Sequence, residues 1–201
     1  MTTYREPTNL PTLTYPLAVD KEIQLLQTEL KARLSWLEYS FGRAFLGQDE
    51  QRAGDYVYPM VHKGNKEYKD ASPNDYLKSQ SFFFIDGDYD YDNYEINTAN
   101  KIEVPVSLII WGNLSKISST PEHFGQVLLQ DVLRVLREWG SVKVNRITDN
   151  EPDVFSPFSV RDEHTHLFYY PYFCYRIEMT MYTSEECGED IDQALTDYNI
   201  T

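Results

Sequence analysis

The chain has 201 residues, of which 41% are hydrophobic and 25% are charged, so it is long enough for a domain with a sizeable core and too apolar for a disordered chain. Its 32 Asp and Glu outnumber its 18 Lys and Arg, which gives a formal net charge of -14. This charge disfavours a groove that grips nucleic-acid phosphates, and no apolar run approaches the roughly 18 residues that a membrane span needs.

The first 19 residues predict an extended arm, because Pro7, Pro11 and Pro16 oppose a helix. A long helix is predicted to follow, from Asp20, a suitable N-cap, to Leu46. Its apolar residues recur every three or four positions and form one apolar stripe along about six turns. Gly47 is predicted to end this helix. The stripe consists of Ile23, Leu26, Leu30, Leu34, Leu37, Phe41 and Phe45.

Between residues 54 and 111 the apolar pattern predicts strands. The segments DYVYPMVHKG and SQSFFFIDG predict two of them, separated by the turn-rich KDASPNDY. In KIEVPVSLIIWGNL, alternation predicts a strand whose even-numbered residues from Ile102 to Ile110 share one face. Pro105 has no backbone N–H to donate to a neighbouring strand, which predicts that this strand lies at an edge of the sheet or is bulged near its start.

The rest of the chain predicts a second helix and two further strands. Ser119 and Glu122 have the spacing of a capping box, and an apolar helix face runs from Phe124 to Trp139. SVKVNRI predicts a short strand, and YFCYRIEMTMYT predicts the closing one. The residues predicted to share a face of the closing strand are Phe173, Tyr175, Ile177, Met179 and Met181.

This order of elements predicts an α+β fold, in which two amphipathic helices pack on one face of a mostly antiparallel sheet. We assign residues 1–19 to the extended arm, 20–188 to a single domain and 189–201 to an acidic C-terminal tail.

The stretch DGDYDYDNYE, residues 86–95, has acids at alternate positions, as a calcium loop would. A calcium-binding hand needs Gly at its sixth position and Glu at its twelfth, where this chain has Tyr91 and Asn97. The alternation favours a solvated hairpin arm, with tyrosines on one side and acids on the other. The candidate interface residues of this arm are Asp86, Asp88, Tyr89, Asp90, Tyr91, Asp92 and Tyr94.

A candidate metal site lies in RDEHTH, where Asp162, His164 and His166 could act as ligands with help from Cys174. This spacing alone is weak evidence. Cys174 lies in a predicted strand among aromatic residues, which favours a buried, inert thiol, and whether it pairs with Cys187 stays open. The sequence contains no nucleophile elbow, glycine-rich phosphate loop or twin-Cys metal signature. We therefore predict no catalytic residue, metal or cofactor.

The chain resembles the tail-terminator and neck proteins of tailed bacteriophages. The resemblance rests on the order of the predicted elements and on the character of VPVSLIIWGNL, LLQDVLRVLREW and YRIEMTMYT, and it covers most of the chain. The family pattern is a helix, a β-hairpin with a projecting arm, a strand, a second helix and a closing strand. Extra residues at 62–80, at 148–170 and at the C-terminus suit an elaborated ring protein, such as one of the crAss-like phages.

The resemblance implies a structural virion protein, made in the host cytoplasm, that forms a homo-oligomeric ring in the neck or tail. Its partners would be further copies of itself and adjacent virion proteins, and DNA would pass through without sequence-specific binding. In this interpretation, the acids of the arm keep phosphates from sticking, and the tyrosines make contacts. Two alternatives stay open: a soluble cytoplasmic enzyme with a metal at Asp162, His164 and His166, and a protein-binding adaptor that forms no ring.

Overall fold

The computed structural model describes residues 10–48, 56–88, 90–92, 101–120, 124–149, 151–159 and 162–184. The helices are α1 (Ala18–Arg33), α2 (Leu114–Ile117), α3 (Phe124–Glu138), α4 (Glu151–Val154) and the 3-10 helix η1 (Asp162–Phe168). The strands are β1 (Tyr39–Gln48), β2 (Val57–Gly64), β3 (Glu67–Asp70), β4 (Ser79–Ile85), β5 (Asp90–Asp92), β6 (Lys101–Asn113), β7 (Val142–Thr148) and β8 (Tyr172–Ser184).

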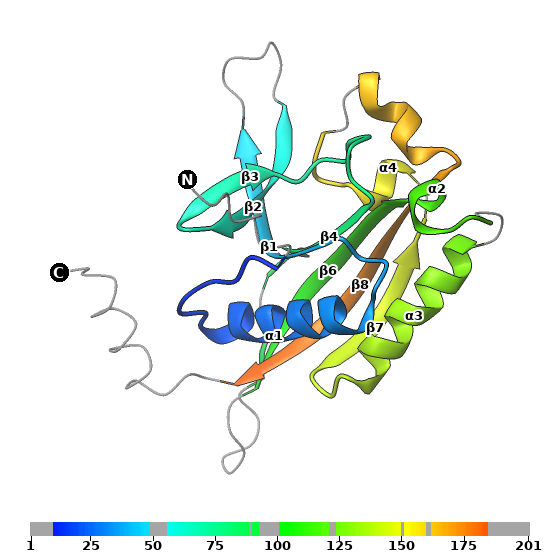
Figure 1. Ribbon diagram of the computed structural model, residues 1–201. Coiled ribbons are helices and arrows are strands. Elements are labelled where there is room, and N and C mark those ends of the chain that lie inside the picture. The colour runs from blue at the N-terminus through cyan, green and yellow to red at the C-terminus, as the bar shows by residue number, and fades with distance from the viewer. Residues whose placement is uncertain are drawn as a thin grey trace, which may run out of the picture.

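The strands form one sheet in the order β3-β2-β1-β4-β6-β8-β7, and the short β5 pairs with β6 beside this path. Among the described pairs, β1 with β4 is parallel and the others are antiparallel. The two longer helices, α1 and α3, lie on the same side of the sheet (Figure 1). The predicted α+β fold with a mostly antiparallel sheet is therefore confirmed.

The predicted first helix is wrong beyond Arg33, because the stretch that carries Phe41 and Phe45 is strand β1. A register shift early in β1 places Phe41 in a core on one face of the sheet and Phe45 beside α1 on the other face. The aromatic residues of this stretch favour the strand. Gly47, predicted as the helix stop, lies in β1 opposite Tyr58, where an added Cβ would come within 2.5 Å of the tyrosine ring.

The start of α1 also differs from the prediction. The helix begins at Ala18, and its N-cap residue Leu17 makes no capping hydrogen bond through its side chain. Asp20, predicted as the N-cap, lies in the first turn instead and forms an ion pair with Arg43 of β1, at 3.6 Å. This pair connects the helix to the sheet.

The described part of the N-terminal arm is attached to α1 by two glutamines. Gln24 exchanges two hydrogen bonds with the backbone of Leu13, and the amide of Gln27 donates to the carbonyl of Pro11 at 2.9 Å. The same Gln27 amide donates to the carbonyl of Ser40 at 2.7 Å, so one buried side chain holds the arm, the helix and β1 together.

The face of the sheet beneath α1 and α3 holds the first of two cores. The predicted faces of β6 and β8 are confirmed here. Val104, Val106, Leu108 and Ile110 from β6 are buried together with Phe173, Tyr175, Ile177, Met179 and Met181 from β8. The two helices are joined at their C-terminal ends by an ion pair of 2.6 Å between Arg33 and Glu138.

The opposite face of the sheet carries a second core that the sequence did not predict. Residues of the segment between β7 and β8 pack there against Ile109 and Trp111 of β6, namely Val154, Phe155, Phe158 and Leu167. The indole of Trp111 donates to the carbonyl of Leu167 at 2.8 Å. Cys174 is 6% exposed in this core, which confirms the predicted burial of its thiol.

The prediction that β6 is an edge strand or bulged near Pro105 is wrong. β6 lies between β4 and β8, and it pairs with β8 without a register shift. The carbonyl oxygen of Pro105 accepts a hydrogen bond from the backbone N–H of Asp86 at 2.9 Å. In an antiparallel strand the N and the C=O of one residue point to the same side, so the Pro105 nitrogen faces the gap between β4 and β5. A proline is tolerated in this central strand because no ladder donor is needed at that gap.

Leu30→Ala should lower the free energy of unfolding by about 2–5 kcal/mol, because Leu30 is 0% exposed in the first core. Leu25 on the same helix is 50% exposed, so Leu25→Ala is the matched control and should change stability by less than about 0.5 kcal/mol. Urea denaturation measures both. Equal losses in the two variants would contradict the assigned helix face.

Candidate assembly interface

The sheet has two outermost strands, β3 and β7, which lie at opposite ends of it (Figure 1). Among the described strands, β3 pairs with β2 alone and β7 pairs with β8 alone. Their outer edges therefore leave backbone N–H and C=O groups that can pair with another chain. Two open edges on one sheet are the main feature that could mediate assembly.

Both ends of the sheet also expose apolar side chains. Phe45, Leu46 and Tyr68 lie near the β3 end and are 38%, 56% and 45% exposed. On β7 all residues from 143 to 147 are exposed, including Val144 and Ile147. An exposed apolar edge is an aggregation hazard for a monomer, and it becomes useful when a partner covers it.

The root of the acidic arm is fixed within the chain. The carboxylate of Asp86 accepts a hydrogen bond from the guanidinium of Arg176, and it accepts another from the hydroxyl of Ser107 at 3.2 Å. The Arg176 side chain is 5% exposed and also donates to the carbonyls of Val154 and Ser156. This one buried cation therefore joins β8, the arm root and the segment that covers the second core.

The other arm candidates are placed in part. Asp90, Tyr91 and Asp92 form β5, in register with Glu103, Ile102 and Lys101 of β6. Asp88 is exposed, while Tyr89 and Tyr94 lie outside the described residues. The interface role of these residues stays a prediction.

The candidate metal ligands are not brought together where the structure describes them. His166 lies 3.3 Å from the carboxylate of Asp75, and Cys174 is buried in the second core. Asp162 and His164 belong to η1, but their side chains are outside the description. Within the described part of the chain, no three His, Cys, Asp or Glu side chains form a group that could hold a metal ion.

His166 belongs instead to a surface cluster around Asp75. The hydroxyl of Tyr172 donates to Asp75, and the ammonium of Lys116 donates to the Asp75 carbonyl. The Tyr172 hydrogen bond holds the pKa of Asp75 below its usual value. Sequence reasoning missed this cluster because Asp75 and Tyr172 are separated by 97 positions.

Exposed tyrosines accompany this cluster. Tyr76 is 94% exposed directly after Asp75, and Tyr169 and Tyr170, between η1 and β8, are 64% and 66% exposed. Tyrosine combines a large apolar face with a polar tip and is enriched in protein interfaces. The cluster therefore presents a second kind of contact surface, separate from the two sheet edges.

No helix among the described residues is long and apolar enough to cross a membrane. No protein-family model matches the chain, and no curated protein matches it. The chain's own surfaces are therefore the basis for inferring its function.

Asp86→Ala should lower the free energy of unfolding by about 1–3 kcal/mol, because it leaves the buried Arg176 without its closest carboxylate. The matched control is Asp88→Ala, two residues further along, where the side chain is exposed and the change should stay within about 0.5 kcal/mol. Chemical denaturation measures both variants. If the Asp86 variant were as stable as the control, Arg176 would not depend on this pair.

Tyr172→Phe should lower the melting temperature at pH 7, because it removes the hydroxyl donor from Asp75. The folded pKa of Asp75 lies below the ordinary value of 3.8, so its stabilising contribution is present above pH 3.8 and is lost as the pH falls through the folded pKa. The difference from the wild type should therefore shrink well below pH 3.8. Tyr76→Phe, at an exposed tyrosine, should match the wild type at both pH values. An undiminished difference at low pH would contradict the role of Asp75.

Proposed function

We propose that this chain is a structural virion protein that forms a homo-oligomeric ring in the head–tail connector of a tailed bacteriophage. The observation that most supports this is the pair of open, partly apolar edges, β3 and β7, at opposite ends of one sheet. The α+β architecture agrees with the pattern that the sequence resemblance implies. In this proposal the protein is made in the host cytoplasm and becomes part of the neck or tail of the virion.

Two different surfaces at opposite ends of one molecule favour head-to-tail association, because each copy offers one surface and covers the other. In the proposed ring, the β7 edge of one copy contacts the β3 end of the next. Val144 and Ile147, which are exposed on β7, then pack near the exposed Tyr68 of the neighbour's β3. In the proposed assembly, the rotation between neighbouring copies is one that closes these head-to-tail contacts into a ring rather than an open filament.

The charge of the chain suits a channel through which DNA passes. The formal net charge is -14, and the arm adds Asp88, Asp90 and Asp92 beyond the paired Asp86. Like charge keeps phosphates from sticking to a channel wall, so DNA slides past without sequence-specific binding. We propose that the arm acids face this channel.

The exposed tyrosines beside Asp75 give the ring a surface for other proteins. Tyr76, Tyr169 and Tyr170 lie on connections rather than on the outer strands β3 and β7. In the proposed ring they stay available after neighbouring copies have paired. Adjacent neck or tail proteins are the partners that we assign to them.

Val144→Glu should prevent ring formation, because it places a charge on the exposed apolar edge of β7. Val127→Glu is the matched control, since Val127 is 47% exposed and lies on helix α3 rather than on an outer strand. Native mass spectrometry and negative-stain electron microscopy over a range of protein concentrations, and in assembled particles, read out the ring. Unchanged rings in the Val144 variant, or no ring under any of these conditions, would contradict the proposal.

Deletion of residues 88–94 tests the arm separately. This deletion removes the short β5 but spares Asp86 and its pair with Arg176, so the monomer should still fold. Assembly, or incorporation into particles, should fail. Normal assembly of the deletion variant would remove the arm from the proposed interface and leave the sheet edges as the contact.

A further inference from the structure

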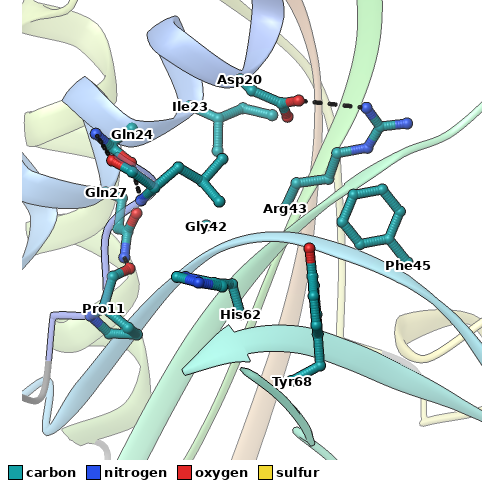
Figure 2. Close-up of a pocket in the computed structure, with 11 residues that line it drawn as sticks. Pro11, Asp20, Ile23, Gln24, Gln27, Gly42, Arg43, Phe45, His62 and Tyr68 are labelled. Atoms are coloured by element: carbon teal, nitrogen blue, oxygen red, sulfur yellow. Dashed lines mark hydrogen bonds and ion pairs between the residues drawn. The ribbon is translucent and has the colours of Figure 1, made fainter. Parts of the chain in front are cut away.

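A cavity of about 180 Å³ lies between α1, the N-terminal segment, β1 and the β2–β3 hairpin. Figure 2 shows Asp20 and Arg43 on one side of this space and His62 and Tyr68 on the other. Pockets for drug-sized ligands measure roughly 300–1,000 Å³. This cavity is smaller, so it suits a ligand of one ring rather than a nucleotide.

Two polar atoms in the walls of the cavity lack hydrogen-bond partners in the described structure. They are the Oδ1 atom of Asp20 and the Nδ1 atom of His62, both of which are buried. Buried polar atoms are nearly always hydrogen-bonded, and each exception calls for an explanation. A ligand whose polar groups reach both side chains after small side-chain rotations would supply one.

The charges in the cavity nearly balance. The guanidinium of Arg43 lies 3.6 Å from the carboxylate of Asp20 and also stacks over the Phe45 ring, with 4.8 Å between its Cζ atom and the ring centroid. The Oδ1 atom of Asp20 is left without a hydrogen-bond partner in the described structure. Burial lowers the pKa of His62, which favours its neutral form. A ligand with a net charge would meet an unfavourable partner in either Asp20 or Arg43, whereas an uncharged ligand with adjacent donors and acceptors could bond to both.

Aromatic rings form the mouth of the cavity. Phe45 and Tyr68 meet edge to face with ring centroids 6.2 Å apart, and both are partly exposed. Figure 2 shows the Tyr68 hydroxyl directed toward Arg43. An aromatic face packs well against the C–H face of a sugar ring, while a carboxylate and a guanidinium bond to neighbouring hydroxyls.

We propose that this cavity binds one uncharged sugar ring, either as a free monosaccharide or as the end of a glycan. One hydroxyl donates to Asp20, its neighbour accepts from Arg43, and a further hydroxyl bonds to His62. The sugar ring packs on Tyr68. This site is inferred separately from the proposed ring, although the ring would bring a neighbouring copy close to Tyr68.

The test is a nuclear magnetic resonance titration of the dilute, ¹⁵N-labelled protein, because Phe45 and Tyr68 also lie at the β3 end that a neighbouring copy would cover. The probes are D-glucose, D-galactose, D-mannose and N-acetyl-D-glucosamine, with glycine as a zwitterionic comparison. At least one sugar should shift the backbone signals of Gly42, His62 and Tyr68 in a saturable way. Glycine should not.

Two variants and two controls complete the test. Asp20→Asn and Tyr68→Ala should each weaken sugar binding about tenfold or more, because they remove a charged acceptor and the aromatic face. Asp131→Asn and Tyr76→Ala change the same residue types outside the cavity and should bind as the wild type does. If Asp20→Asn does not fold, the half-exposed Tyr68 still decides the result.

Three outcomes would overturn the proposal. The first is the absence of saturable shifts at the cavity with every sugar. The second is a response to glycine without a response to any sugar, which would assign the cavity to zwitterions. The third is undiminished sugar binding in the folded variants, which would place the bound sugar elsewhere. A ring that assembles normally while sugars fail to bind would leave the proposed function intact.

Discussion

The antiparallel pairing of β6 with β8 is the constraint on which the rest of the structure depends. Each strand has 13 residues, and they pair in one register from Lys101 opposite Ser184 to Asn113 opposite Tyr172. A slip of one residue would turn every side chain to the other face of the sheet. Both hydrophobic cores are buried against this pair, so they fix the register and are positioned by it.

The pairing of β6 with β8 also explains why position 112 is a glycine and why an arginine is buried at position 176. Gly112 lies opposite Phe173, and an added Cβ would come within 2.6 Å of the phenylalanine ring, so only glycine lets the ring lie across the strand. Arg176 lies in the ladder opposite Ile109, from where its side chain reaches the arm root and the segment over the second core. The strand pair therefore positions the arm as well as the cores.

The candidate surfaces lie where the fold leaves its physical requirements unmet. The outer edges of β3 and β7 retain unpaired backbone groups, and the cavity near α1 retains two unpaired polar atoms. Each of these features lowers the stability of an isolated chain. Natural proteins keep such features mainly at functional sites, because a partner or ligand then supplies the missing interactions.

The sequence by itself determined the central strands and the second helix. Alternation in KIEVPVSLIIWGNL and YFCYRIEMTMYT persists long enough to identify the faces of β6 and β8, and the stripe that begins at Phe124 matches α3. Local periodicity is sufficient in these segments because each one buries a continuous face. The predicted arm at residues 86–95 is described only in part, and the contact of Asp86 with Arg176 was not predicted.

Tertiary structure alone decided the remaining features. The apolar residues of Tyr39–Gln48 continue the spacing of a helix, but the pairing of this segment with β2 and β4 makes it a strand. Asp86 accepts a hydrogen bond from Arg176, which is 90 positions away, and Asp75 accepts one from Tyr172, which is 97 positions away. Periodicity reports which face of a segment is buried, whereas the partner of a polar side chain depends on how distant segments meet in space.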